Sequence, residues 1–153
     1  MKRAPQFKRG ITLIEMLVVM TLVGLLTAVV APSVGSGVET VRLRATGEKL
    51  AATLRTARTR ALRTQHYMQV SVDPQLRIVE LRDLEGGSVS SWEIPSTIQV
   101  RSEQRLAFLV YPDGGTQMMR LELRNQRGRE VEVVSDPFTM FPTVREMPRE
   151  VTR

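Results

Sequence analysis

A 21-residue apolar stretch near the N-terminus is the feature that most restricts what this chain can fold into. Residues 11–31 read ITLIEMLVVMTLVGLLTAVVA and contain one ionisable side chain, Glu15. As an α-helix rising about 1.5 Å per residue, the stretch covers about 30 Å, the thickness of the hydrocarbon core of a bilayer. Residues 1–10 hold four basic side chains and no acidic one. This charge bias predicts a single-pass membrane helix with a cytoplasmic N-terminus.

A cleaved secretory signal peptide is the alternative interpretation of this segment. Such peptides have an apolar core of about 7–15 residues that ends at a small-residue cleavage site. Here the apolar stretch is longer, and Pro32 follows the small residue at its end. We therefore expect residues 11–34 to remain attached to the chain as a membrane anchor.

Glu15 is the exception within the apolar stretch. A carboxylate costs about 2.5–3.5 kcal/mol at the centre of a bilayer on insertion scales, less near an end, and such groups are usually paired and functional. No basic residue lies between residues 11 and 31. We therefore expect the partner of Glu15 to come from outside this chain.

The composition limits the chemistry that the remainder can perform. The chain has 153 residues, 42% of them hydrophobic, which is enough for one domain with a core. It has no cysteine and one histidine, so zinc binding and histidine-dependent nucleophilic catalysis have few candidate side chains. We therefore expect no enzymatic activity, no metal and no cofactor. The formal charge of +6 comes from the N-terminal segments, because acids outnumber bases from residue 65 onward.

Residues 35–64 have the pattern of an amphipathic helix. Small and apolar residues recur at alternating spacings of four and three at Leu43, Gly47, Leu50, Leu54, Ala57 and Ala61. Gly47 is either a weak point in this helix or a position where a strand approaches closely. The other faces carry seven basic residues within 39–64. They form either a solvated surface or a contact with anionic headgroups or with acidic surfaces of neighbouring subunits.

Residues 65–153 have strand and turn patterns. Alternating side chains, interrupted by glycine and proline, predict strands at 66–72, 76–82, 89–94, 98–101, 106–111, 118–123 and 130–134. The last stretch, 136–153, has no clear period. A long N-terminal helix followed by short antiparallel strands predicts an α+β fold, in which the sheets bury one face against the amphipathic half of the helix.

The junction between the basic and the apolar segment resembles the prepilin signature of type IV pilins and type II secretion pseudopilins. Residues 8–19 read KRGITLIEMLVV, and the family requires the basic leader, the glycine and the glutamate at this spacing. The resemblance implies that residues 1–10 are a leader, cleaved after Gly10, and that Ile11 is then N-methylated by the prepilin peptidase. It places Glu15 at the fifth mature position, and Pro32 at a family position that kinks the helix.

The resemblance agrees with the physics of Glu15. A buried carboxylate and a buried amine each have a large desolvation penalty, which pairing them offsets in part. Glu15 can therefore meet the Ile11 amine of an adjacent subunit and fix the register of a helical stack. A leader that still carries Lys8 and Arg9 prevents this, so cleavage acts as an assembly switch.

The remainder is similar to GspH minor pseudopilins and their relatives, the FimT and FimU minor pilins. The similarity rests on the basic helix leading into strand 66–72, on the sequence FLVYPDGG at 108–115, and on the Arg127-Gly128 hairpin, while residues 136–141 depart from the family pattern. The similarity implies that the protein is a minor pseudopilin, a structural component at the tip of a type II secretion pseudopilus. It also implies a single membrane anchor in the bacterial inner membrane and a head, residues 65–153, in the periplasm. The implied partners are the prepilin peptidase, other minor pseudopilins and the major pseudopilin. The alternative is a minor type IV pilin for pilus assembly, priming or DNA uptake.

The remaining candidate groups favour structural roles. His66 has no second histidine or cysteine to share a metal, so we expect a structural or exposed side chain. Asp73, Asp83 and Glu85 lack the spacing of an EF-hand and are interpreted as solvated loop acids rather than calcium ligands.

Nucleic-acid binding is disfavoured. The candidate arginines are Arg127, Arg129, Arg145, Arg149 and Arg153. A phosphate-binding surface needs clustered positive charge with few acids between the bases. Here Glu146 and Glu150 stand beside two of these arginines.

Overall fold

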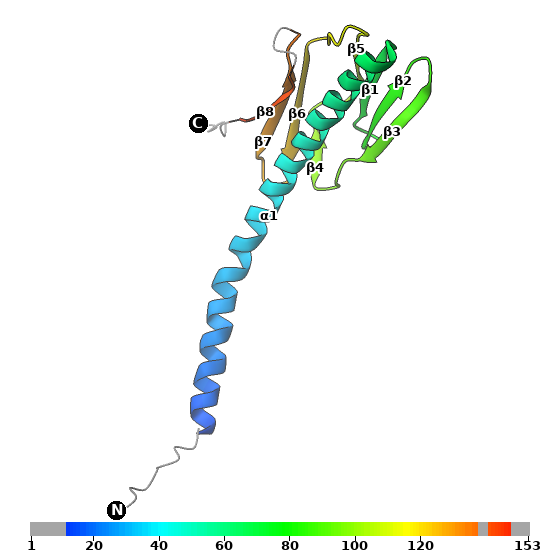
Figure 1. The fold of residues 1–153 in the computed structure, drawn as a ribbon. Helices are drawn as coiled ribbons and strands as arrows, with labels where there is room; N and C mark the ends of the chain where they lie inside the picture. The colour runs from blue at the N-terminus through cyan, green and yellow to red at the C-terminus, as the bar shows by residue number, and fades with distance from the viewer. Residues whose placement is uncertain (1–11, 138–140, 148–153) are drawn as a thin grey trace, which may run out of the picture. The chain divides into compact units, whose positions relative to one another are not determined.

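The computed structural model describes residues 12–137 and 141–147, except for the side chains of residues 29–36. The chain divides into two compact units, residues 1–37 and residues 38–153. Their elements are one helix, α1, and eight strands, β1–β8 (Figure 1).

Helix α1 comprises Leu13–Thr64, and it includes residues 33–37, which contain two glycines and two serines. Gln65 ends it with a left-handed φ of 60°. In the first unit the large apolar side chains of α1 are exposed, for example Leu13 at 84% and Met20 at 72%. Within the part of the chain that the structure describes, no helix has the length and apolar character needed to cross a membrane.

The second unit contains two four-stranded antiparallel sheets. The first has the order β3-β2-β1-β5, with β1 at Met68–Asp73, β2 at Ile78–Asp83, β3 at Gly87–Glu93 and β5 at Leu106–Val110. The second has the order β4-β6-β7-β8, with β4 at Ile98–Val100, β6 at Met119–Asn125, β7 at Glu130–Ser135 and β8 at Thr143–Glu146. The predicted α+β fold, a helix packed on antiparallel sheets, is confirmed.

Each of the seven predicted strands exists within two residues of its predicted bounds. Strand β8 was missed, because its four residues are partly or wholly exposed and show no alternation that a sequence pattern could reveal. It is held by main-chain pairing with β7, in which Val144 lies opposite Val133.

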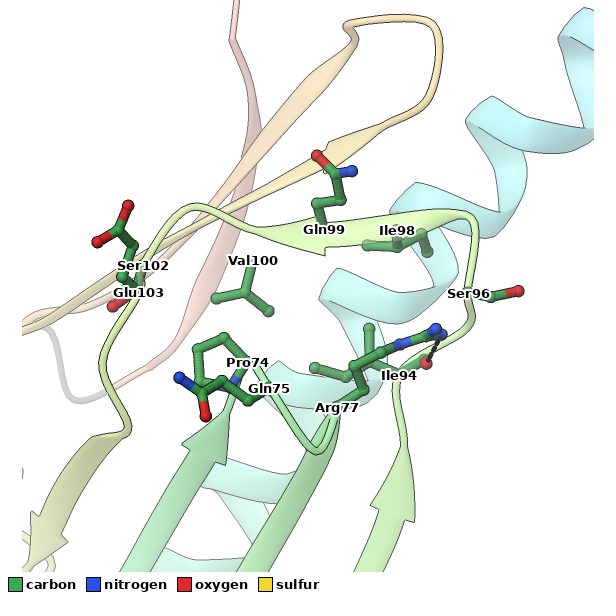
Figure 2. A pocket seen from close by; sticks show the side chains of 10 residues that line it. All are labelled: Pro74, Gln75, Arg77, Ile94, Ser96, Ile98, Gln99, Val100, Ser102 and Glu103. Carbon is green, nitrogen blue, oxygen red and sulfur yellow. Dashed lines mark hydrogen bonds between the residues drawn. The ribbon is translucent and has the colours of Figure 1, made fainter.

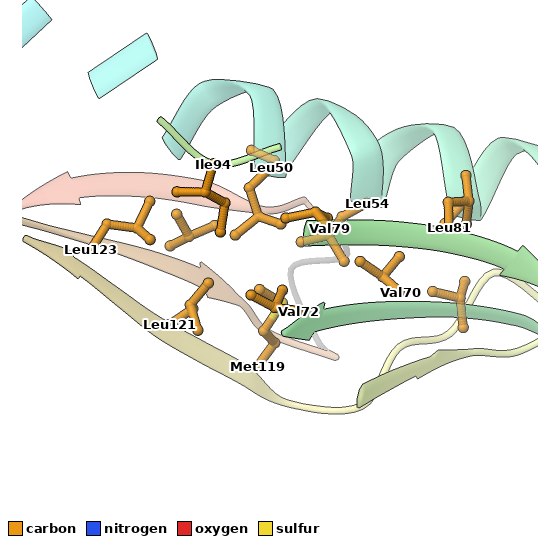
Figure 3. Packing of buried hydrophobic residues seen from close by; sticks show 14 of the residues in the cluster. Leu50, Leu54, Val70, Val72, Val79, Leu81, Ile94, Met119, Leu121 and Leu123 are labelled. Carbon is orange, nitrogen blue, oxygen red and sulfur yellow. The ribbon is translucent and has the colours of Figure 1, made fainter. Parts of the chain in front are cut away.

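The core of the second unit lies between α1 and the inner faces of both sheets (Figure 3). The predicted stripe of α1 is buried throughout: Leu43, Gly47, Leu50, Leu54, Ala57 and Ala61. It meets Val70, Val72, Val79 and Leu81 of the first sheet and Met119, Leu121 and Leu123 of the second. Because one stripe contacts both sheets, the helix is the element that joins them into one core.

Gly47 is a position where strands approach the helix closely, and not a weak point in the helix; these were the two alternatives that the sequence left open. A Cβ atom there would lie 3.1 Å from Val144 Cγ1 and 3.6 Å from the Cγ2 atoms of Val131 and Val133. Strands β7 and β8 therefore lie so close to the helix backbone that even a Cβ atom would require Val144 to move by a few tenths of an ångström.

Candidate functional site

The first candidate site is the start of α1. Gly10 and Ile11, the predicted cleavage and methylation residues, lie outside the described residues. Thr12 Oγ1 accepts a hydrogen bond from the Glu15 backbone N–H at 3.3 Å, so Thr12 is the N-cap and Glu15 occupies the third helical position of a T-x-x-E sequence. A carboxylate in the first turn also complements the positive end of the helix dipole. Glu15 thus stabilises the helix start while its side chain remains exposed.

Two further predictions for this segment are the external partner of Glu15 and the helix kink at Pro32. No basic side chain among the described residues forms a salt bridge with Glu15, so its external partner stays a prediction. Pro32 lies within α1, and its side chain is outside the described residues.

The basic surface of α1 is partly engaged by the head. Arg44 Nη1 lies 3.7 Å from Glu146 Oε1, and Arg55 Nη2 lies 3.8 Å from Glu48 Oε2. The Lys49 ammonium stands 4.4 Å from the centre of the Trp92 ring. Exposed ion pairs of this kind contribute little to stability, and five of the seven basic side chains of this helix are exposed: Arg42, Arg44, Lys49, Arg55 and Arg63.

His66 bridges two carboxylates at the junction between α1 and β1. Its Nδ1 lies 3.1 Å from Asp83 Oδ2, and its Nε2 lies 3.2 Å from Glu85 Oε2. The hydrogen bond to Asp83 is the main cause that raises the pKa of His66, and it lowers the pKa of Asp83. Asp83 is therefore not the solvated loop acid that the sequence suggested: its side chain is only 13% exposed.

Asp83 has a further structural role. Its Oδ1 accepts hydrogen bonds from the backbone N–H groups of Glu85 and Gly86, both at 3.0 Å, and so closes the β2–β3 turn. In the described part of the chain, no cluster of histidine, aspartate and glutamate side chains has the arrangement of a metal site. The bridge from His66 to Asp83 and Glu85, called the His66 latch below, links the junction between α1 and β1 to the β2–β3 turn.

A groove of about 560 Å³ lies beside strand β4 and was not anticipated from the sequence (Figure 2). It is lined by Pro74, Gln75, Arg77, Ile94, Ser96, Ile98, Gln99, Val100, Ser102 and Glu103. These residues belong to the β1–β2 turn, to the β3–β4 connection and to β4 with the residues after it. Two segments distant in sequence, residues 74–77 and 94–103, form the groove, so no local pattern could have revealed it.

Of the three candidate DNA-binding arginines that the structure describes, two lie beside acidic side chains. Arg127 Nε lies 3.0 Å from Glu39 Oε2, an ion pair that ties the β6–β7 turn to α1. Arg145 lies on β8 beside Glu146, which pairs with α1. Arg149 and Arg153 lie outside the described residues.

Comparisons with known proteins point to one class. Residues 6–31 match the family described as the prokaryotic N-terminal methylation motif. Over 93 residues, 61% of this chain, the sequence is 34% identical to the type II secretion system protein H of Xanthomonas campestris pv. campestris. The chain spans about half, 52%, of the length of that relative.

Two solved structures share the fold. The minor pseudopilin EpsH of the type II secretion system of Vibrio cholerae superposes with a TM-score of 0.54 at 11% identity, over 69% of this chain and 96% of that one. The type IV minor pilin FimU of Pseudomonas aeruginosa superposes with a TM-score of 0.50 at 14% identity, over 72% and 91% of the two chains.

The chain thus combines the methylation motif with the fold of a minor pseudopilin and of a minor pilin. The chain is also similar in sequence to a type II secretion system protein H, and in fold to a minor pseudopilin of such a system. The named relatives are pilin and pseudopilin components rather than enzymes.

Proposed function

We propose that this protein is a minor pseudopilin of a type II secretion system, a non-enzymatic structural component at the tip of the pseudopilus. The observation that carries the proposal is the combination, in one chain, of the methylation motif at residues 6–31 and a sequence similar to a type II secretion protein H. Its partners are the prepilin peptidase, other minor pseudopilins and the major pseudopilin.

The anchor is the N-terminal half of α1. Residues 11–34 lie in the inner membrane, and the head of residues 38–153 lies in the periplasm. The exposed apolar side chains of α1 in the first unit support this arrangement, because contiguous exposed apolar surface of this extent marks a protein or membrane contact.

Glu15 is the assembly residue in this proposal. After cleavage at Gly10, the methylated amine of Ile11 on a neighbouring subunit pairs with the Glu15 carboxylate. The capping interaction with Thr12 holds Glu15 in the first helical turn, which limits the positions at which such an amine can approach.

Processing provides the first test. Gly10→Val should leave the basic leader attached and prevent assembly, while the precursor still enters the membrane. Intact-mass spectrometry should show that the wild-type chain begins at N-methylated Ile11. A mature N-terminus at any other residue contradicts the proposed processing.

Assembly provides the second test. Glu15→Ala should enter the membrane as well as the wild type, because a costly carboxylate is gone, but should co-purify poorly with tip partners and reduce secretion. Glu48→Ala, a loss of the same charge farther along α1, is the control and should assemble normally. Unchanged co-purification and secretion in Glu15→Ala would leave a plain membrane anchor as the better interpretation.

A minor type IV pilin is the alternative function, and the fold shared with FimU is the observation that keeps it open. The two functions separate in a deletion strain. Loss of secreted proteins from the medium with intact surface pili supports the pseudopilin, and loss of pili or of DNA uptake with normal secretion supports the pilin.

A further inference from the structure

The open edge of β4 and the groove beside it form a second surface, independent of the N-terminal motif. In an antiparallel pair, the main-chain groups of alternate residues point toward and away from the partner strand. Arg101 N–H donates to Glu122 O of β6 at 2.9 Å, so Val100, one residue earlier, points its N–H and C=O away from β6. The outer edge of β4 therefore offers a donor and an acceptor for an additional strand.

By contrast, the β5 edge of the first sheet is covered by the chain itself. Gln117 covers the outer side of β5: its N–H donates to Leu109 O at 3.2 Å, and its Oε1 accepts from Leu109 N–H at 3.4 Å. No such cover lies on β4 among the described residues. An unpaired edge of this kind is a template for another extended chain.

Arg77 supplies the charge of the groove. Its Nη2 donates to Ile94 O at 2.6 Å, and Ile94 N–H donates back to Arg77 O at 2.7 Å, so the guanidinium is fixed at one end (Figure 2). The Nε of Arg77 is buried and has no hydrogen-bond partner in the described part of the chain. The backbone of Arg77 has a left-handed φ of 57°, a conformation that a non-glycine residue adopts at a cost.

The groove is electrically asymmetric. Glu103 is the other charged residue that lines it, and Figure 2 shows it at the end away from Arg77. A carboxylate is therefore attracted to the Arg77 end, where a guanidinium N–H that Ile94 O does not use can donate a charge-assisted hydrogen bond to it.

We propose that the outer edge of β4 and the adjoining groove bind an extended polypeptide segment of a partner protein by strand addition, with a carboxylate side chain of that segment on Arg77. The main-chain groups of Val100 supply the pairing and Arg77 supplies the selectivity, the division of labour that is general for strand-addition sites. This site goes beyond the proposed assembly role and does not depend on it, since Gly10, Ile11 and Glu15 take no part.

The test uses the full-length chain in detergent micelles, with ¹³C-methyl-labelled isoleucine. Ile94 and Ile98 line the groove, and Ile14 at the helix start serves as the internal control. The probe is a blocked seven-residue peptide of alternating valine and threonine with glutamate at its centre. We expect the methyl signals of Ile94 and Ile98 to shift on titration while that of Ile14 does not.

Three matched comparisons identify the mode of binding. Replacing the central glutamate of the peptide by glutamine should weaken binding about tenfold, because a charge-assisted hydrogen bond is lost. A peptide N-methylated on its backbone should not bind, because it cannot pair with β4. In Arg77→Gln the glutamate and glutamine peptides should bind equally, whereas Arg63→Gln on α1, a matched loss of charge outside the groove, should keep the tenfold preference.

The outcomes that overturn the proposal are equally definite. It fails if the peptide leaves Ile94 and Ile98 unshifted, or if the N-methylated peptide binds as well as the parent. It also fails if acetate alone produces the same shifts at the same concentration, since the site would then take a small carboxylate and not a strand. If Arg77→Gln does not fold, the ratio between the glutamate and glutamine peptides on the wild-type chain still decides.

Discussion

The two halves of α1 contain similar apolar side chains that differ in their exposure to solvent. In the first unit Leu22 and Leu26 are 56% and 65% exposed, whereas in the second unit Leu50 and Leu54 are 1% and 3% exposed. Both pairs have helical spacing and similar side chains. The difference is that two sheets cover the second half of the helix, whereas the described large apolar side chains of the first half are exposed.

This contrast shows where the stabilising partners of each half lie. The second half obtains its burial from the chain itself, so the sequence of the head must complement it residue by residue. The first half has no such complement among the described residues, and an exposed apolar surface of this kind marks a contact with lipid or with another protein. A helix can therefore belong to two different environments without any change in its local conformation.

Separating the two halves should give the largest effect. Removal of residues 1–34 deletes the exposed apolar surface and retains the helix half that carries the core. We expect the remaining 119 residues to form a soluble, folded monomer of mixed helix and strand content, whereas the full chain requires detergent. Circular dichroism and analytical ultracentrifugation measure this. A random-coil spectrum or obligate aggregation would show that the head does not supply its own core.

Within that truncated head, a matched pair of α1 substitutions sharpens the comparison. Leu50→Ala leaves a cavity between the sheets and should lower the free energy of unfolding by about 2–5 kcal/mol. Val41→Ala, on the same helix but 68% exposed, should change it by less than about 0.5 kcal/mol. Urea unfolding of both variants gives the two values, and similar losses would contradict the assignment of the buried face.

Two glycines of α1, Gly47 and Gly37, allow the buried and the exposed parts of the helix to be compared with a smaller expected effect. Gly47→Leu forces a side chain into the space occupied by Val144 and should destabilise the head by about 1–3 kcal/mol. A Cβ at Gly37 meets no atom within 4 Å, so Gly37→Ala should have little effect on the unfolding midpoint. Equal midpoints for the two variants would mean that β7 and β8 do not lie against the helix at Gly47.

Periodicity predicted the parts of the fold that depend on burial. The stripe from Leu43 to Ala61 was correct because a helix that covers two sheets needs an apolar residue at every turn. Most strand predictions were correct because one face of the strand is buried and the other is not, which produces alternating side chains in the sequence. Strand β8 lacks that difference and is defined by main-chain pairing with β7, which leaves no trace in side-chain polarity.

The candidate sites follow the same division. Glu15 could be singled out from the sequence because a carboxylate within an apolar stretch is unusual whatever fold the rest of the chain adopts. The bridge from His66 to Asp83 and the groove at Arg77 could not, because each depends on segments 17 residues or more apart. Such contacts follow from sheet register, which is set by the whole fold.

The smallest predicted effect concerns the His66 latch. Because the pKa of His66 is raised in the folded head, its contribution to stability is fully present below the unfolded value of 6.5 and is lost as the pH rises through the folded pKa. The pKa of Asp83 is lowered, so its contribution is present above its unfolded value of 3.8 and is lost as the pH falls through its folded pKa. The latch is therefore most effective between those two unfolded values.

The single histidine makes this effect measurable. Between about pH 6 and pH 8 few other groups titrate, so the pH dependence of unfolding in the truncated head reports His66 directly. The head should lose stability across this range. Asp83→Asn keeps an oxygen for the β2–β3 turn and removes the charge, so it should flatten the dependence. NMR titration of the imidazole should give a pKa above 6.5 in the wild type and a lower one in Asp83→Asn. An imidazole pKa that is the same in both proteins would mean that Asp83 does not hold His66 in its protonated form.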